Sequence, residues 1–321
     1  MNCDGVQARF GSYLRHALDP QVMAAMRKHL DRCEDCWVTW NRFRWDKAAG
    51  TSLYQDLKEF LGERFIYYFD SSRELAREWE EVAPTCQTEV ENFYRQSVSY
   101  LYNLTVWEAS GNRPPYAQRA AAKLAREGSS VILDYGCGIG SDVIRLRELG
   151  FTVVPCDFIS PSVEFLQWRL DRLGQPTNVF EPHELDSAPK PDTLWIIDTI
   201  DHLPCIEKYI GCSLSDARFV ACENLSSSRA HGKQGFHYRR GFDEIETVFN
   251  RYGLYLAASD SPTDPLMYWK ARRKPEPMAG SSASGSDNWP DTGVCLTRKG
   301  ADVGRWPGQA KTGTNPNRRT S

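Results

Sequence analysis

The residues best suited to ligand chemistry lie in the middle of the chain, in the run VILDYGCGIGSD at residues 131–142. An apolar stretch there ends in Asp134 and passes into Gly136, Gly138 and Gly140. Glycine lets the backbone turn sharply and approach a ligand closely, because a Cβ atom would occupy that space. The run therefore predicts a strand, a ligand-binding loop and then a helix.

Two common glycine-rich loops do not fit this spacing. The nicotinamide dinucleotide fingerprint G-x-G-x-x-G needs a third glycine where this chain has Ser141. A Walker-type phosphate loop needs G-K-[ST], which does not follow. A nucleoside is favoured by Asp157, which ends the apolar run TVVPCD. A carboxylate about twenty residues after such a loop can accept hydrogen bonds from both hydroxyls of a ribose.

The run from Asp134 to Gly140 has the form D-x-G-x-G-x-G and resembles motif I of the class I S-adenosylmethionine-dependent methyltransferases. Asp157 is similar to the ribose-binding acid of that family, and TLWIIDTIDHLP at 193–204 resembles its fourth strand and the following turn. The resemblance covers residues 116–273 and implies S-adenosylmethionine as cofactor. The resemblance also implies an acidic residue near the amine of the adenine, which is Glu184, with Asp186 as the alternative. The full cofactor set that it implies is Asp134, Gly136, Cys137, Gly138, Gly140, Asp157, Phe158, Glu184 and Asp198.

Three histidines are candidates for a catalytic role. A methyl group on a sulfonium is already activated, so the protein must mainly hold donor and acceptor in line. A general base is needed only if the acceptor is protonated at the working pH, and the candidates are His202, His231 and His237. His231 and His237 belong to the insert 226–244, above the carboxyl ends of the expected strands. Each of the two fits an ordinary loop residue equally well, and His202 can simply cap a turn.

The fold is indicated by strand-like and helical runs that alternate from Val131 onward. The strand-like runs are VILDYG, TVVPCD, TNVFE, TLWIID, ARFVACEN, YLAASD and LMYWKARR. Such alternation implies crossover connections and a mainly parallel sheet with helices on both faces. We expect an α/β, Rossmann-like fold with a seven-stranded sheet, closed by the antiparallel hairpin that the family resemblance implies.

Four parts are expected along the chain: a zinc-finger-like helical segment (1–45), a helical region (46–115), the methyltransferase domain (116–273) and a disordered tail (274–321). The helical region is rich in aromatic residues, which either pack the helices together or form a lid over the substrate. The tail has too few apolar residues to offset the entropy of ordering it.

A cysteine and histidine cluster lies near the N-terminus. His29-x3-Cys33-x2-Cys36 places the imidazole and two thiols on successive helical turns, and Cys3 or His16 can supply a fourth ligand. The pattern resembles the zinc-finger of the anti-sigma-factor type, which implies a structural Zn²⁺ held by Cys3, His29, Cys33 and Cys36. Unligated thiols are the other interpretation. In that family the finger often docks on a protein partner, although here it is fused to a methyltransferase-like domain and not to a membrane helix.

Composition and charge limit the partners. The net charge is -3, but residues 270–321 carry ten Lys/Arg against four Asp/Glu, so that segment is +6 and the remainder -9. An acidic body argues against nucleic acid as the main partner. No apolar run approaches the roughly 18 residues that span a bilayer. The N-terminus lacks the pattern of a secretory signal, so we expect a cytoplasmic protein with its ten cysteines reduced or bound to metal.

The leading hypothesis is methyl transfer from S-adenosylmethionine to a small molecule, because an acidic body with aromatic helices suits an enclosed apolar acceptor. The alternative is a zinc-dependent regulatory or scaffold protein whose methyltransferase-like domain binds a nucleoside. Methylation of RNA or protein is a third hypothesis. Nucleic-acid amino methyltransferases often carry N/D-P-P-Y/F after the fourth strand, where this chain has DTIDHLP, so that chemistry is disfavoured.

Overall fold

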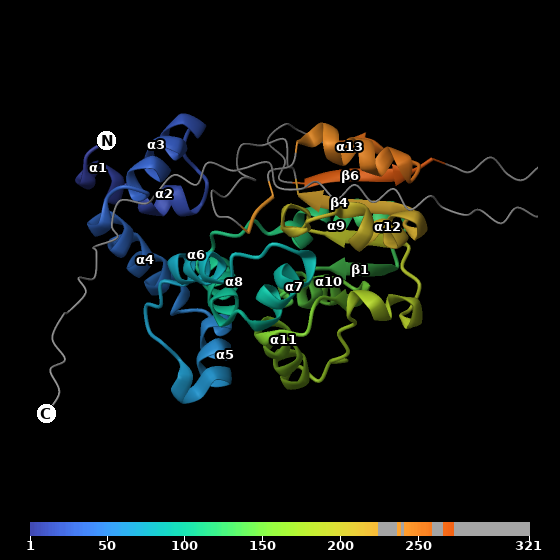
Figure 1. Ribbon diagram of the computed structural model, residues 1–321, viewed down its shortest axis with the longest axis horizontal. Coiled ribbons are helices and arrows are strands. Elements are labelled where there is room, and N and C mark those ends of the chain that lie inside the picture. Colours follow the sequence, from blue (N-terminus) through green and yellow to red (C-terminus); the bar gives the residue numbers. More distant parts are fainter. Residues whose placement is uncertain (224–235, 239–240, 259–265, 273–321) are drawn as a thin grey trace, which may run out of the picture.

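The computed structural model describes residues 1–223, 236–238, 241–258 and 266–272. His231 and the expected tail lie outside these residues. Figure 1 shows the N-terminal helices on one side and the sheet with its covering helices on the other. No helix of the described residues is long and apolar enough to cross a membrane.

The N-terminal part of the chain is helical. Its helices are α1 (Cys3–Gln7), α2 (Phe10–Leu14), α3 (Pro20–Leu30), α4 (Glu34–Ala48), α5 (Ser52–Leu61), the short 3-10 helix η1 (Gly62–Arg64), α6 (Ser71–Val82), α7 (Gln87–Gln96) and α8 (Val98–Ala109). Helix α3 begins where the Asp19 side chain accepts the Gln21 N–H and Pro20 occupies the first turn.

The sheet has the order β2-β1-β3-β4-β6-β5. Its strands are β1 (Val131–Tyr135), β2 (Thr152–Cys156), β3 (Thr193–Ile196), β4 (Phe219–Glu223), β5 (Leu254–Ala258) and β6 (Leu266–Ala271). Strands β1 to β4 pair in parallel, and β6 runs antiparallel to both of its neighbours. The predicted Rossmann-like, mainly parallel sheet with a closing antiparallel pair is confirmed.

We expected seven strands, and the described residues form six. The run TNVFE makes only a single bridge, between Phe180 and Cys156. Pro176 and Pro182 flank it, and a proline has no N–H to extend a ladder. The 3-10 helix η2 (Pro182–Ser187) begins directly afterwards.

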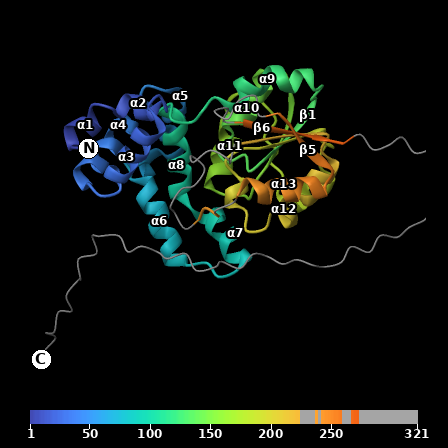
Figure 2. The same ribbon diagram turned by 90° about the horizontal axis from the view of Figure 1, so that it is seen from above.

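Helices cover both faces of the sheet, as Figure 2 shows. One face carries α9 (Tyr116–Arg126), α10 (Ser141–Glu148) and α11 (Pro161–Arg172), and the other carries α12 (Ile206–Asp216) and α13 (Phe242–Arg251). On β1, Ile132 packs into the first of these cores and Leu133 into the second. A strand covered on both faces has to be apolar throughout, which explains the run at 131–135.

The chain changes direction between β1 and β3. From β1 it passes outward to β2 and then returns to β3 on the opposite side of β1. At such a switch point the connections after the two central strands diverge and leave a crevice at their carboxyl ends. The glycine loop follows β1, and Asp198 and the 3-10 helix η3 (Ile200–His202) follow β3.

The N-terminal helices pack onto the sheet domain through one shared core. Trp45 of α4, Leu57 of α5 and Leu101 of α8 belong to a buried cluster that also contains Ile139 of the glycine loop and Phe165 of α11. Helix α8 lies between α4 and the sheet in both Figure 1 and Figure 2. It is therefore placed to close the crevice.

Candidate functional site

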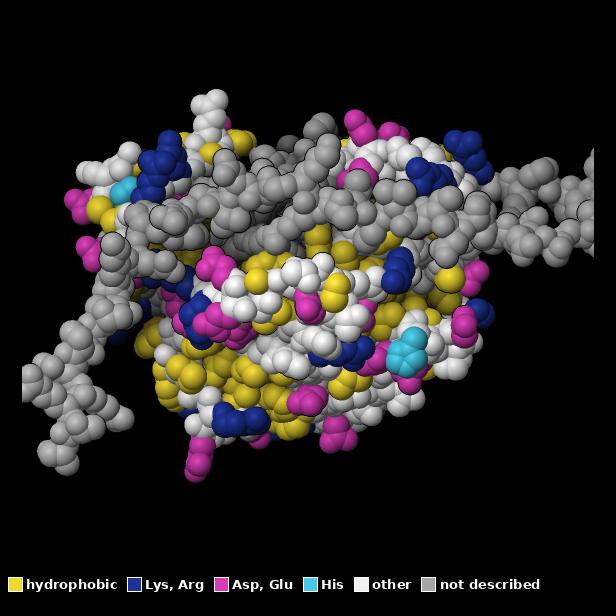
Figure 3. Space-filling view, in the orientation of Figure 1, with side chains coloured by type: hydrophobic (Ala, Val, Ile, Leu, Met, Phe, Trp, Pro, Cys, Tyr) yellow, Lys and Arg dark blue, Asp and Glu magenta, His cyan; other side chains and the backbone are white. Residues whose placement is uncertain are grey.

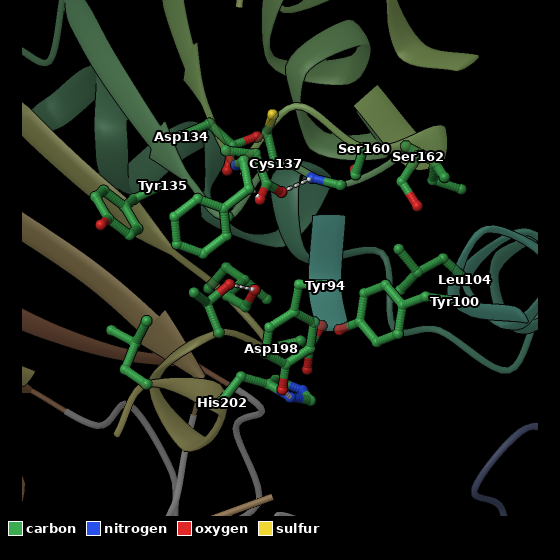
Figure 4. Close-up of a pocket in the computed structure, with 18 of the residues that line it drawn as sticks. Tyr94, Tyr100, Leu104, Asp134, Tyr135, Cys137, Ser160, Ser162, Asp198 and His202 are labelled. Carbon is green, nitrogen blue, oxygen red and sulfur yellow. Dashed lines mark hydrogen bonds between the residues drawn. The ribbon is translucent and has the colours of Figure 1, made fainter. Parts of the chain in front are cut away.

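A cavity lies at the switch point. It occupies about 1080 Å³ when the space at its open mouth is included, and the loops after β1, β2 and β3 line it. Figure 4 shows Tyr94, Tyr100 and Leu104 of helices α7 and α8 across the cavity from Asp134 and Cys137. Of the residues predicted to bind the cofactor, the lining includes Asp134, Gly136, Cys137, Gly138, Asp157, Phe158 and Asp198.

The glycine loop needs its glycines for two different reasons. Gly136 and Gly140 have φ values of +78° and +75°, and an added Cβ would lie 2.3 Å from Thr199 Oγ1 and 2.0 Å from Leu166 Cδ1, respectively. Packing alone therefore excludes a side chain at both positions. Gly138 faces the cavity, where a Cβ would lie 3.0 Å from Leu104 Cδ1 on the opposite wall. Gly140 does not line the cavity but serves as the N-cap of α10.

Asp157 is fixed by two backbone hydrogen bonds. Its Oδ2 accepts the Gly138 N–H at 2.8 Å, and its Oδ1 accepts the Phe158 N–H at 2.7 Å. Burial raises the pKa of Asp157 to about 6, although these two N–H groups favour the carboxylate. Each oxygen retains acceptor capacity, so the side chain can accept two hydroxyl groups from a ligand.

Asp134 offers a buried acceptor. Among the described residues, no hydrogen-bond partner reaches its Oδ2 atom. Burial raises the pKa of Asp134 well above its usual range. A buried polar atom of this kind requires a donor, and Asp134 lines the cavity, so the ligand can provide it.

Sequence reasoning did not identify an ion pair that lines the cavity. Arg113 donates two hydrogen bonds to Asp142, at 3.0 and 2.6 Å, and its Nε lies 3.6 Å from Asp198 Oδ2. Burial alone would lower the pKa of Arg113, but the carboxylates, led by Asp142, raise it well above its usual value. Trp195 Nε1 also donates to Asp142 at 2.9 Å. The only signals were a lone arginine in the break at 111–115 and the acid that follows Ser141.

Two of the three candidate histidines come together. His202 lines the cavity, and its ring lies 4.4 Å from that of His237, centroid to centroid. Burial lowers the pKa of His202 to about 4, so its imidazole is neutral at physiological pH. His231 lies outside the described residues.

The aromatic residues of the helical region divide between the two expected roles. Trp79 and Phe93 are buried in the packing of α6 and α7. Tyr94 and Tyr100 line the cavity, where burial raises the pKa of both phenols, so they stay neutral. Val90, Leu104 and Trp107 complete an apolar wall.

Glu184, predicted to lie near the adenine, does not line the cavity. Its carboxylate accepts the backbone N–H of Glu181 at 2.9 Å and so stabilises the start of η2. The alternative, Asp186, also lies outside the cavity lining. Both follow the run TNVFE, which pairs with β2 only at Phe180 and continues through Pro182 into η2.

The four predicted zinc ligands converge at the N-terminus. One ligand atom each from Cys3, His29, Cys33 and Cys36 lies within 4.8 Å of the others. Cys3 Sγ is 3.7 Å from His29 Nε2 and 3.8 Å from Cys33 Sγ. The Cys36 N–H lowers the pKa of the Cys33 thiol, whereas hydrogen bonds with Cys36 and Cys33 raise the pKa of the Cys3 thiol to about 11. A bound metal would favour the thiolate at both positions. Three sulfurs and one imidazole suit tetrahedral Zn²⁺.

His16, the alternative fourth ligand, is not in this cluster. Its Nε2 lies 3.0 Å from the Asn112 carbonyl oxygen. The cluster lies against a small core of its own, which is formed by Val6, Phe10, Leu14, Met26, Leu30, Cys36 and Trp40.

Comparisons with known proteins agree with the N-terminal prediction. Residues 3–36 match the family model described as "Putative zinc-finger". A search of curated protein sequences gave no match.

Among solved structures, the chain is similar to magnesium protoporphyrin IX methyltransferase (ChlM) from Synechocystis PCC 6803 with bound SAM. The identity is 16% and the TM-score 0.39, over 70% of this chain and 99% of that chain. For the CcbJ methyltransferase from Streptomyces caelestis the identity is 16% and the TM-score 0.38, over 50% of this chain and 97% of that chain. For the mitomycin 7-O-methyltransferase MmcR the identity is 13% and the TM-score 0.39, over 69% of this chain and 72% of that chain. At TM-scores below 0.5 the site has to be interpreted from its own residues.

Proposed function

We propose that this chain is an S-adenosylmethionine-dependent methyltransferase that acts on a small molecule. The observation that carries the proposal is the cavity at the switch point, where the glycine loop and Asp157 are joined by the Gly138 hydrogen bond. Ligands of open α/β sheets bind at this place.

The polar groups of the cavity fit the two ends of this cofactor. Asp157 can accept the ribose hydroxyls, and Phe158 beside it offers an apolar surface to the adenine. Asp134 Oδ2, which lacks a partner among the described residues, can accept a hydrogen bond from the ammonium group. Gly138 leaves the space between these groups open, because it has no Cβ.

The carboxyl groups that line the cavity also fit the positive charges of the cofactor. Asp134, Asp157 and Asp198 line it, and burial raises the pKa of Asp198 to about 7. The sulfonium and ammonium groups of the cofactor are positive, and a nearby positive charge favours the carboxylate form. Arg113 also lines the cavity, but its guanidinium is already paired with Asp142 and lies beside Asp198.

The bound cofactor would supply a methyl group on a positively charged sulfur, which is transferred by in-line displacement. The residues of the chain have to hold the acceptor in line with that bond and exclude water. Tyr94, Tyr100 and Leu104 are the wall that can do both. His202 and His237 remain candidates for contact with the acceptor, and His231 remains a prediction.

A small acceptor is supported by the enclosed apolar wall of Val90, Leu104 and Trp107. On the face drawn in Figure 3, Lys and Arg side chains are interspersed with Asp and Glu. Among the described residues on that face, the basic side chains form no continuous surface for a nucleic acid.

The test is calorimetric titration of S-adenosylmethionine and S-adenosylhomocysteine into the wild type, Asp157→Ala, Gly138→Val and, as a matched acidic control, Glu184→Ala. We expect micromolar binding by the wild type, at least about 100-fold weaker binding by the first two variants, and unchanged binding by the control. Absence of binding by the folded wild type would overturn the proposal.

We also propose a structural Zn²⁺ at Cys3, His29, Cys33 and Cys36, and the division of the chain at 45, 115 and 273. A segment this small needs a metal to supplement its core. Its separate core, with Trp40 and Phe10, supports a unit that can offer a surface to a protein partner. Cofactor binding without turnover of any acceptor would favour the regulatory alternative.

A further inference from the structure

A second group of ligand-type side chains lies beside the cavity. One donor atom each from Asp201, His202 and His237 lies within 4.8 Å of the others. His237 Nδ1 is 3.4 Å from Asp201 Oδ2, and His202 Nε2 is 3.8 Å from Asp201 Oδ1. Two ligand atoms bound at about 2.1 Å to one tetrahedral ion lie about 3.4 Å apart. The three side chains are therefore spaced nearly as ligands of a single ion.

Tyr94 determines which nitrogen of His202 can bind. The Tyr94 hydroxyl has one hydrogen and two contacts that could receive it, the Phe236 carbonyl at 3.2 Å and His202 Nδ1 at 3.0 Å. A carbonyl oxygen can only accept, so when the hydrogen goes to Phe236 the tyrosine oxygen accepts from Nδ1. Nδ1 then carries the hydrogen, and Nε2, the atom nearer to Asp201, presents its lone pair. An outer hydrogen bond that fixes the tautomer in this way is typical of metal-binding imidazoles.

The three side chains are shielded from water but not sealed off. The exposed fractions of the side chains are 10% for Asp201, 12% for His202 and 20% for His237. His202 lines the cavity, and Figure 4 shows its ring beside Tyr94 at the end of the cavity away from Asp134. An ion held here would lie at the edge of the space that a ligand enters.

We propose that Asp201, His202 and His237 bind one divalent ion of the first transition series and leave coordination positions open toward the cavity. Two imidazoles with one carboxylate form a donor set that suits Zn²⁺ or Fe²⁺ and accommodates a further oxygen ligand. This site is separate from the N-terminal cluster, which has three thiols and has no open position once all four ligands bind.

The role of the ion, unlike its binding, rests on the proposed function. The acceptor class is a molecule with a hydroxyl group. An ion lowers the pKa of a hydroxyl that it binds, so the proton leaves to solvent at neutral pH. The oxygen lone pair then forms the bond to the methyl carbon, while the carbon–sulfur bond breaks and its electron pair stays on sulfur.

The experiment measures bound Zn²⁺ per chain by equilibrium dialysis at low micromolar Zn²⁺. We expect two ions for the wild type, one for Cys36→Ser, and one for each of Asp201→Asn and His237→Asn. The matched control is His183→Asn, an exposed histidine outside both clusters, which should still bind two. The same number of ions in the wild type and in His237→Asn would overturn the proposal.

Tyr94→Phe separates metal binding from loss of folding. It keeps the ring and removes only the hydroxyl that orients His202, so we expect about tenfold weaker binding of the second ion. Unchanged affinity would contradict the assigned tautomer and with it the site. Cofactor titration of the same variants separates the two proposals, because a second ion without cofactor binding leaves the metal site intact and removes only its role.

Discussion

The backbone N–H of Gly138 donates a 2.8 Å hydrogen bond to Oδ2 of Asp157. This contact joins the loop after β1 to the end of β2, so the two halves of the expected nucleoside site are positioned before any ligand binds. Preorganisation of this kind reduces the free energy that binding would otherwise spend on ordering the loop. The same hydrogen bond links the ionisation of Asp157 to the conformation of the glycine loop.

The first prediction concerns pH. Burial raises the pKa of Asp157 from 3.8 to about 6, so the carboxyl takes up a proton as the pH falls through 6. Hydroxyl groups bind the carboxylate more strongly than the acid. Affinity for S-adenosylhomocysteine should therefore be full above pH 7 and about tenfold lower at pH 5, as calorimetry at several pH values would measure.

Asp157→Asn is the control for this prediction. Its affinity should be weaker but independent of pH between 5 and 8. A raised carboxyl pKa in the folded state means that its contribution to stability is lost as the pH rises from about 4 to 6. Between pH 5 and pH 7.5 the melting temperature of the wild type should therefore fall more than that of the variant, in which only one of the two backbone N–H groups keeps its acceptor. A flat profile in the wild type would contradict the assignment.

The second prediction compares two glycines. Gly140 and Gly150 both have a positive φ, at +75° and +92°, so alanine should cost about 1 kcal/mol at either position. Only at Gly140 does the new Cβ also meet a buried side chain, 2.0 Å from Leu166 Cδ1. Gly140→Ala should lose about 1–3 kcal/mol more than Gly150→Ala in urea unfolding. Equal losses would mean that the loop moves aside freely.

The parts that could be predicted from the sequence have local causes. The order of apolar runs predicted the sheet, and the spacing of Gly136, Gly138 and Gly140 predicted the loop, because steric limits on the backbone act over a few residues. Cys3, His29, Cys33 and Cys36 were predicted to meet because three of them were expected on successive turns of one helix. The structure instead ends α3 at Leu30 and begins α4 at Glu34, and the four ligands still converge.

The parts that were missed depend on long-range packing. Arg113 and Asp142 are 29 positions apart and meet only because α9 and α10 pack on the same face of the sheet. Tyr94 and His202 are separated by 108 positions. Glu184 lies outside the cavity lining, in η2, which begins at Pro182 directly after the run TNVFE. No local pattern reports such contacts.

The third prediction tests the buried ion pair. Arg113 is 12% exposed and Asp142 7%, and they share two hydrogen bonds. Arg113→Met leaves buried carboxylates without their counter-charge and should destabilise the protein by about 3–5 kcal/mol. Urea unfolding would measure this loss.

Two further variants give the controls for that loss. Arg145→Met removes an exposed pair with Glu148 and should cost less than about 1 kcal/mol. Adding Asp142→Asn to Arg113→Met removes the uncompensated charge, while the amide oxygen can still accept from Trp195. The double variant should therefore be more stable than Arg113→Met alone. An additive loss would show that the charge of Asp142 is not the cause.

The last prediction concerns the N-terminal cluster. Cys33→Ser should lose one bound Zn²⁺ and unfold helices α1 to α3, because their core is a small group that includes Val6, Phe10 and Trp40. Circular dichroism should report less helix, and the tryptophan emission should shift to longer wavelength. The control is Cys86→Ser, an exposed cysteine outside the cluster, which should change neither signal. The cofactor cavity depends on the cores of the sheet and of α4, α5 and α8, so affinity for S-adenosylhomocysteine should stay within about twofold of the wild type. Loss of that affinity together with the metal would mean instead that the finger supports the cavity, and would favour a zinc-dependent regulatory protein.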